Sequence, residues 1–329
     1  MKAIGYLTNL PINDAQSLMD IEIDKPSASG RDVLVQVESI SVNPVDTKIR
    51  ANVAPQSGYK VIGWDAVGSV VEVGDASSLF KVGDKVWYAG DLTRSGSNAE
   101  FQLVDERIVS HAPNSLSNAE AAALPLTTLT AWEMLFDRLQ VSGDKRILII
   151  GAAGGVGSIM VQLAKKLTKL HVIATASRPE SVQWLKELGA DQVIDHHQSL
   201  SEQLGGENCV DYIVSLNNTQ QHLAQVYKII KPQGKFGLID DPSSFDIMPF
   251  KRKSVSVHWE FMYTRSMFET SDMQQQHVIL DKVANMIDAG QIKTTLGEHF
   301  GTINAQNLKR AHGLLESMQA RGKIVLEGF

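Results

Sequence analysis

The amino-acid sequence predicts a two-domain α/β protein, in which a β-rich domain precedes a doubly wound parallel sheet. The chain has 329 residues, more than one ordinary hydrophobic core accommodates. Up to about Pro113 it carries short β-like runs without long helical periods. From Lys145 onward, apolar runs alternate with amphipathic stretches at intervals suited to βαβ units.

The first part reads as a partly open β-barrel. Its apolar runs "DVLVQVESISV", "AVGSVVEVG" and "KVGDKVWYAG" are separated by glycine and aspartate. The pattern changes at "SLSNAEAAALPL", where Ser117 and Glu120 form a capping box and Pro125 interrupts the helix. We therefore place the first domain at residues 1–124 and expect the helical stretch through "TTLTAWEMLFDRLQ" to lead into the second.

The second domain, residues 125–268, has the alternation of a parallel sheet covered by helices. Its predicted strands are "RILIIG", "LHVIATA", "QVIDH", "DYIVSL" and "KFGLID". A helix beginning at Gly155 presents one apolar face, made of Val156, Ile159, Met160, Leu163, Ala164 and Leu167. Because the first domain lacks long helices, we expect the last segment, residues 269–329, to return to it.

A bare turn in "IIGAAGGVGSIM", residues 149–160, links a strand to that helix. Gly154 and Gly157 match the second and third glycines of the dinucleotide fingerprint, and Ala152 stands at the first. Such a turn lets backbone amides and the helix dipole hold a pyrophosphate. The predicted cofactor-binding residues here are Ala152, Gly154, Gly155, Val156 and Gly157. The alternative is that the glycines serve only tight strand-to-helix packing.

The end of the next strand indicates which dinucleotide binds. NAD-preferring sites usually place an acid there, whereas "ATASRPES" has Ser177 and Arg178. A hydroxyl and a guanidinium favour the 2′-phosphate of NADPH. Glu180 follows Pro179 in the first helical turn, where a carboxylate favours the dipole. Alternatively, Arg178 is an exposed charge at a helix start.

Composition excludes several classes of protein. The net charge of -6 and pI near 5.9 argue against a protein that holds nucleic acid or anionic lipid by charge. A single cysteine, Cys209, excludes a disulfide framework and every multi-cysteine zinc site. No apolar run approaches the roughly 18 residues of a membrane span, and the N-terminus lacks a signal-peptide pattern. We expect a cytoplasmic protein.

Seven stretches in order along the chain resemble the medium-chain dehydrogenase/reductase superfamily: "SVNPVDTKIR", "GWDAVGSVVEVG", "FKVGDKVW", "AAALPLTTLTAWEML", "GAAGGVG", "LGADQVIDH" and "GKIVL". The chain is most similar to the zinc-free quinone oxidoreductase branch related to zeta-crystallin, often labelled zinc-type alcohol dehydrogenase-like. The resemblance implies a GroES-like catalytic domain, a Rossmann domain and an active site in the cleft between them.

The chain departs from its zinc-dependent relatives at the metal positions. By resemblance, Asn43, Trp64 and Leu124 stand where the catalytic zinc ligands would be. The structural zinc loop is missing too, because "YAGDLTRSGSNAEFQ" contains no cysteine. Alcohol oxidation requires a group that stabilises a developing alkoxide. Quinones and activated enones need less help, because hydride transfer to them yields a delocalised oxyanion.

The resemblance also implies roles for further residues. Asn43 and Tyr59 are candidates for hydrogen bonding to the substrate, and Trp64 for a pocket wall; Tyr59 is the favoured proton donor, or else an exposed loop residue. Asp46 is expected to support its loop, while Asp65 fixes a turn or is buried against a basic partner. The remaining candidate cofactor residues are Thr127, Asn217, Phe261 and Lys323, whereas Asp240 is atypical beside a cofactor.

Together these features predict an NADPH-dependent reductase of quinones or α,β-unsaturated carbonyl compounds that needs no catalytic metal. The alternatives are a zinc-dependent alcohol dehydrogenase and a non-catalytic, crystallin-like NADPH-binding protein, with or without affinity for single-stranded nucleic acid. The acidic balance argues against the nucleic-acid part. By family analogy we expect a homodimer, for which "SVSVHWEF" supplies an edge strand.

Overall fold

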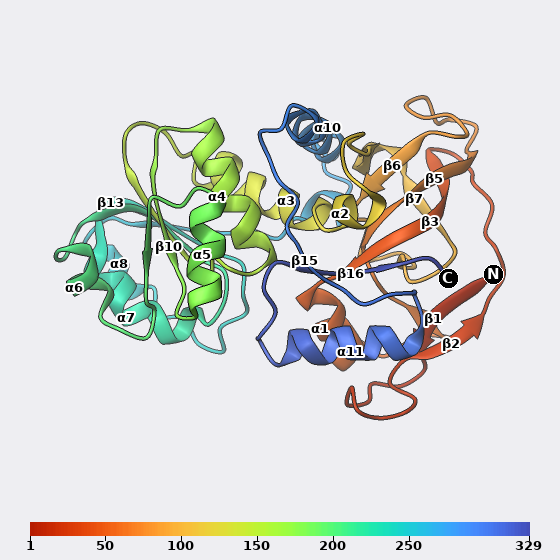
Figure 1. The fold of residues 1–329 in the computed structure, drawn as a ribbon, viewed down its shortest axis with the longest axis horizontal. Coiled ribbons are helices and arrows are strands. Elements are labelled where there is room, and N and C mark those ends of the chain that lie inside the picture. The colour runs from red at the N-terminus through yellow and green to blue at the C-terminus, as the bar shows by residue number, and fades with distance from the viewer. The chain divides into compact units, whose positions relative to one another are not determined.

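A computed structural model describes all residues from Met1 to Phe329 (Figure 1). The chain divides into two compact units. Unit 1 contains Met1–Leu129 and Tyr263–Phe329, and unit 2 contains Thr130–Met262. The C-terminal segment thus belongs to the same unit as the N-terminal half. The sequence-based boundaries, 124/125 and 268/269, lie near these divisions but do not coincide with them.

Unit 1 is built on antiparallel strands. Its larger sheet has the order β15 (Leu296–His299), β16 (Lys323–Glu327), β3 (Asp32–Val42), β5 (Asp65–Val73), β6 (Lys85–Tyr88) and β8 (Val109–His111), with β7 (Phe101–Asp105) also paired to β3. A smaller sheet contains β2 (Met19–Glu22), β1 (Lys2–Tyr6) and β4 (Lys60–Val61). Figure 1 shows the blue β16 beside the red-orange β3, where Ile324 is in register with Val42. This pairing joins the two separate segments of unit 1.

Unit 1 also contains several helices. They are α1 (Pro44–Asn52), η1 (Glu106–Ile108), α2 (Asn118–Ala122), α9 (Thr264–Met267), α10 (Gln275–Asp288) and α11 (Ala305–Glu316), while α3 (Pro125–Trp132) spans the division between the units. The predicted capping box begins α2, because Ser117 Oγ accepts from Glu120 N and Ser117 N donates to Glu120 Oε2 at 2.9 Å. Of these, α2, α10 and α11 pack against the strands of unit 1, α10 on β8, and α11 also packs on α1.

Unit 2 is a six-stranded parallel sheet with helical crossovers. The strand order is β11 (Gln192–Ile194), β10 (His171–Thr175), β9 (Arg146–Ile150), β12 (Val210–Ser215), β13 (Ile230–Leu238) and β14 (Ser256–Trp259). The helices are η2 (Glu133–Arg138, a π-helical segment), α4 (Gly155–Leu167), α5 (Pro179–Glu187), α6 (Leu200–Leu204), α7 (Thr219–Ile229) and α8 (Met248–Lys251). The strand order reverses at β9, which is where open α/β sheets bind ligands. The predicted architecture of a β-rich part plus a doubly wound sheet is confirmed.

The apolar face of α4 covers the sheet as its spacing predicted. Ile159, Met160 and Leu163 are fully buried, whereas Leu167 at the end of the helix is 36% exposed.

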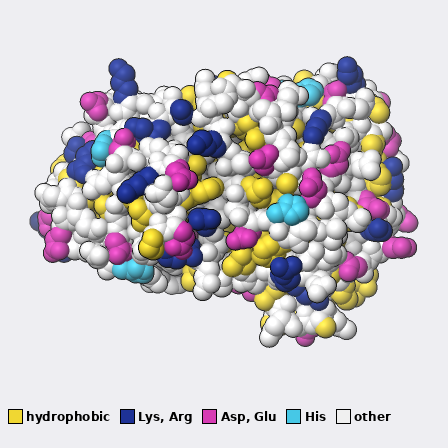
Figure 2. Space-filling model, in the orientation of Figure 1, with side chains coloured by type: hydrophobic (Ala, Val, Ile, Leu, Met, Phe, Trp, Pro, Cys, Tyr) yellow, Lys and Arg dark blue, Asp and Glu magenta, His cyan; other side chains and the backbone are white.

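On the surface seen in Figure 2, acidic and basic side chains are interspersed. No helix is long and apolar enough to cross a bilayer.

Candidate functional site

The glycine turn of unit 2 has two members that the fold itself requires. Gly151 has a φ of +79°, and a Cβ there would lie 2.4 Å from Asn217 Oδ1. A Cβ on Gly157 would lie 2.4 Å from the Cα of Ala152, so that α4 can begin this close to the end of β9 only with glycine at that position. Sequence reasoning placed Ala152 at the position of the first fingerprint glycine and missed Gly151. The signal was the glycine directly after the apolar run.

Gly154 differs from these two glycines. Its φ of -75° suits any residue, and the atom nearest to an added Cβ would be Gly151 O at 3.6 Å. Gly154 is the N-cap of α4 and has no side chain that could accept hydrogen bonds from the backbone amides of the first turn. Gly155 and Val156 provide two of these amides. Nothing within the chain requires glycine here. The open, uncapped end of a helix with 13 residues fits a cofactor phosphate.

Other predicted cofactor residues follow the carboxyl ends of the strands in unit 2. Ser177 and Arg178 come after β10, and both are exposed. Arg178 Nε lies 3.6 Å from Glu180 Oε1, in an ion pair whose side chains are about half exposed. Asn217 is exposed after β12, and Phe261 is exposed after β14. These exposed residues therefore follow the strands at one edge of the sheet.

Asp240, which was unexpected beside a cofactor, has a structural explanation. Its Oδ2 accepts from the backbone N of Thr219 at 2.8 Å, and its Oδ1 accepts from the Thr219 hydroxyl. Thr219 is the first residue of α7, whose N-cap Asn218 makes no side-chain capping bond. The carboxylate of Asp240 therefore caps α7 from the neighbouring strand end.

In unit 1 a buried polar network surrounds Asp65, which has no exposed surface. Its Oδ2 accepts from Ser41 Oγ at 2.7 Å, from Asn43 Nδ2 at 2.8 Å and from Lys323 Nζ at 3.0 Å. Its Oδ1 accepts from the backbone N of Leu126 at 2.7 Å. The carboxylate is thus bonded to four donors, and a cation from β16 balances its charge.

Lys323 does not have the role that the sequence suggested. Its side chain is 3% exposed, and Nζ donates to Val42 O at 3.0 Å, to Asn43 Oδ1 at 2.5 Å and to Asp65 Oδ2 at 3.0 Å. These three acceptors account for all three hydrogens of an ammonium group. Sequence reasoning placed Lys323 among the cofactor-binding residues, as a lysine able to reach the pyrophosphate; in the structure its charge neutralises Asp65 inside unit 1.

Two further ionisable groups are buried near this network. Asp46 Oδ2 accepts from Asn43 N at 2.8 Å, while its Oδ1 is buried without a partner. Burial raises the pKa of Asp46 to about 7, helped by Asp65 and opposed by the Asn43 bond and by Lys323. Burial, and then the nearby carboxylates of Asp46, Asp65 and Asp91, raise the pKa of Tyr263 well above its usual value. Sequence reasoning missed Tyr263, which the fold brings to within 6.4 Å of Trp64 between ring centroids.

The remaining predicted residues of unit 1 lie in different environments. Trp64 is fully buried and donates from Nε1 to Asp91 O at 2.9 Å. Tyr59 is 43% exposed between α1 and β4, outside the Asp65 network. Thr127 is buried, and its hydroxyl donates to Leu124 O at 3.1 Å. The structure therefore brings Asn43 and Lys323 together but does not bring Tyr59 to them.

No group of three or more His, Cys, Asp or Glu side chains is arranged to hold a metal ion. At the three positions where the resemblance places zinc ligands, the chain has an amide, an indole and an aliphatic side chain. The Asn43 amide is already bonded to Lys323 and Asp65.

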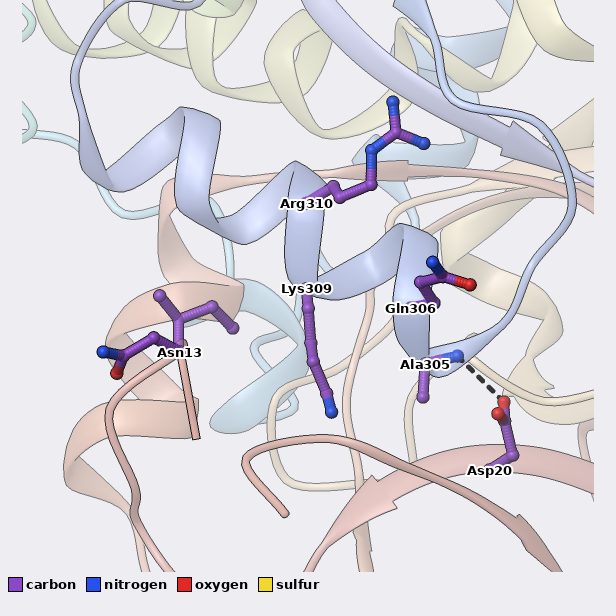
Figure 3. Close-up of a pocket in the computed structure, with 7 residues that line it drawn as sticks. Asn13, Asp20, Ala305, Gln306, Lys309 and Arg310 are labelled. Atoms are coloured by element: carbon purple, nitrogen blue, oxygen red, sulfur yellow. Dashed lines mark hydrogen bonds between the residues drawn. The ribbon is translucent and has the colours of Figure 1, made fainter. Parts of the chain in front are cut away.

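A pocket of about 520 Å³ lies elsewhere in unit 1, between the N-terminal segment and α11 (Figure 3). Both basic side chains of this pocket already have partners within unit 1. Lys309 donates to Ala15 O, and the Arg310 guanidinium lies 4.6 Å from the centroid of the Phe300 ring. Asp20 accepts from the first amide of α11 at 2.8 Å (Figure 3). None of the predicted site residues lines this pocket.

Family models and relatives match most of the chain. The alcohol dehydrogenase GroES-like domain matches residues 29–114, and the zinc-binding dehydrogenase model matches residues 188–326. A zinc-type alcohol dehydrogenase-like protein of Staphylococcus aureus is 40% identical over 99% of both chains. The human mitochondrial NAD(P)H oxidoreductase is 28% identical over 98% of this chain and 87% of its own length.

Solved structures share the fold throughout. A Rhizobium etli protein assigned as a zinc-dependent alcohol dehydrogenase is 53% identical, with a TM-score of 0.97 over 100% of this chain and 98% of that chain. A quinone oxidoreductase of Pseudomonas syringae is 26% identical, with a TM-score of 0.85 over 99% of both chains.

Proposed function

The chain belongs to the medium-chain dehydrogenase/reductase superfamily, and from that premise we propose that it is an NADPH-dependent reductase of quinones or α,β-unsaturated carbonyl compounds that uses no catalytic metal. The observation that carries this proposal is the open, uncapped turn at Gly154, together with Ser177 and Arg178 where an acid would favour NADH. The human relative's description as an NAD(P)H oxidoreductase supports the cofactor class.

The metal-free chemistry rests on the residues of unit 1. A metal at Asn43 would compete with Lys323 and Asp65 for an amide that both already bind. The ammonium of Lys323 leaves the buried carboxylate little net charge with which to attract a second cation. The names of the Staphylococcus and Rhizobium proteins refer to zinc. Metal content therefore distinguishes the proposed metal-free reductase from a zinc-dependent alcohol dehydrogenase.

When bound, the reduced nicotinamide supplies a hydride from its C4 atom. The residues of the chain then bind the cofactor, orient the acceptor and allow its protonation. The glycine turn and the first-turn amides of α4 bind phosphate, and Ser177 and Arg178 bind the 2′-phosphate. Asn43 Nδ2 carries a second hydrogen besides the one given to Asp65, and we assign it to the acceptor oxygen. Water delivers the proton that the reduced acceptor requires, or Tyr59 does so from its position outside the Asp65 network.

The test follows the absorbance of NADPH and NADH with a panel of ortho-quinones, para-quinones and short enones, before and after dialysis against a chelator. The expected result is acceptor-dependent oxidation of NADPH that survives chelation. A stoichiometric metal ion that supports alcohol oxidation would identify a zinc-dependent dehydrogenase. Tight NADPH binding without oxidation by any acceptor would identify the non-catalytic, crystallin-like alternative.

Two glycine substitutions separate cofactor binding from folding. Gly154→Ser adds an N-cap oxygen in open space, so we expect unchanged or slightly raised thermal stability and at least about tenfold weaker NADPH binding. Gly157→Ala forces a methyl group against the backbone of Ala152, and we expect a loss of about 1–3 kcal/mol of stability even without cofactor. If Gly154→Ser bound NADPH as well as the parent protein, the phosphate would lie elsewhere.

We also propose that β14 pairs between two copies of the chain. This strand is the edge of the unit 2 sheet, and Trp259 on it is 53% exposed. An unpaired edge of this kind favours strand addition. Sedimentation velocity at several concentrations measures the association, and a monomer throughout would contradict it.

A further inference from the structure

Three histidine rings gather at the carboxyl edge of the unit 2 sheet. His196 and His197 follow β11, and His222 lies on α7. The ring centroids of His196 and His197 are 4.2 Å apart, and those of His196 and His222 are 6.1 Å apart. His196 Nδ1 is buried without a hydrogen-bond partner, and His222 is 8% exposed. The proposed hydride transfer uses none of these rings.

Strand pairing places His196 beside the residues that we assign to the 2′-phosphate. In the parallel β10–β11 pair, Thr175 is in register with Ile194, and Ala176 N donates to Ile194 O at 3.0 Å. Ser177 and His196 each lie two positions after the Thr175–Ile194 pair, where β10 and β11 end at the same edge of the sheet. A phosphate bound by Ser177 therefore lies within reach of the His196 ring.

The surroundings of His196 and His222 disfavour the charged form of these two rings. Burial, and next the neighbouring His197, lower the pKa of His196, while Asp195 opposes the shift. Burial, and then the charges of the other two rings, lower the pKa of His222 against the effect of Asp240. Two imidazolium ions with centroids 4.2 Å apart would repel each other strongly.

The charged groups around the three histidines form hydrogen bonds or ion pairs with other residues. The Asp195 carboxylate accepts from His197 N at 2.9 Å and from the Gln198 side chain at 3.2 Å. Asp240 caps α7, as described above. On the neighbouring strand end, Arg178 is paired with Glu180. None of these groups makes a hydrogen bond to the His196 ring, and Asp195 is the only one whose charge acts on it, whereas a phosphate bound beside Ser177 would add up to two negative charges.

We propose that His196 is a specificity-determining residue that takes up a proton from solvent when the 2′-phosphate of NADPH binds beside Ser177. The inference rests on the proposed NADPH site and adds a pH dependence to it. Proton uptake leaves an N–H on both ring nitrogens, one of which donates to a phosphate oxygen, and no covalent bond in the cofactor changes. NADH has no 2′-phosphate and so gains nothing from this protonation. The preference for NADPH over NADH therefore increases as the pH falls below neutrality.

Binding calorimetry of the full chain tests this without any turnover. Titrations of NADPH and of NADH, each in two buffers of different ionisation enthalpy, measure the protons taken up per cofactor bound at about pH 6, 7 and 8. The parent protein should take up more protons on binding NADPH than His196→Asn does. The ratio of the parent's NADPH affinity to that of His196→Asn should rise about threefold to tenfold between pH 8 and pH 6. Titration of the phosphate itself is common to both proteins and cancels in this comparison.

Two further variants sharpen the result. His196→Lys places a permanent cation at the same position, so it should bind NADPH tightly at every pH and lose the proton uptake. His171→Asn changes an exposed histidine at the amino end of β10 and should behave as the parent does. Equal proton uptake in the parent and His196→Asn, with NADPH still bound, would overturn this inference and leave the cofactor site standing. Failure of the parent protein to bind NADPH at all would overturn both proposals.

Discussion

Replacing His312 with leucine should remove a titration that destabilises the folded chain in acid. His312 lies on α11, has no exposed surface, and finds no hydrogen-bond partner for either ring nitrogen. Burial, and then the positive charge of Arg50, lower the pKa of His312 from 6.5 to about 3. Arg50 is itself 2% exposed, so water screens little of that repulsion.

The sign follows from where the proton binds. As the pH falls below about 6.5, the unfolded chain protonates this ring, and the folded chain does not until about pH 3. Stability is therefore lost as the pH falls through that window. One pKa unit corresponds to about 1.4 kcal/mol, so that at about pH 5 the parent protein has lost about 2 kcal/mol through His312.

The assay is urea denaturation of the parent protein and His312→Leu at about pH 8, 7, 6 and 5, followed by far-ultraviolet circular dichroism. All other titrations are shared, so that the difference between the two proteins isolates this residue. That difference should shift by about 2 kcal/mol in favour of the variant between pH 8 and pH 5. A constant difference between parent and His312→Leu would refute the reasoning, because the ring would then be protonated in the folded state.

Three further predictions concern the proposed site. Lys323→Met leaves the buried Asp65 carboxylate without its cation and should cost about 3–5 kcal/mol in urea denaturation, whereas adding Asp65→Asn to it should recover part of that loss. Arg178→Asp should weaken NADPH much more than NADH in fluorescence titrations; an equal loss for both would remove Arg178 from the 2′-phosphate site. Chelator treatment should leave the melting temperature and NADPH oxidation unchanged, and a drop in either that zinc restores would show that a metal is bound.

Much of the fold could be predicted because its signals are local. The strand-helix alternation after Lys145, the capping box at Ser117 and the apolar face of α4 each depend on residues close together in the sequence. The β-rich first part could be recognised from its turn residues, although strand order could not. The helical stretch through "TTLTAWEMLFDRLQ" was expected, but its change to a π-helical segment at Glu133–Arg138 was not. Tertiary packing, which no local pattern encodes, decides such a local change of helical pitch.

The site was harder to predict because its contacts span the chain. Lys323 reaches Asp65 across 258 positions, and only the pairing of β16 with β3 brings that ammonium into the interior. A lysine in "RGKIVL" gives no sign of burial, since lysine is almost always exposed unless it is paired. The same holds for His196, whose relation to Ser177 follows from the register of two strands and not from either motif. Residue type identified which groups could act, and strand pairing determined which of them act together. A variant that preserves every motif but shifts that pairing should therefore lose the function while retaining most of its secondary structure.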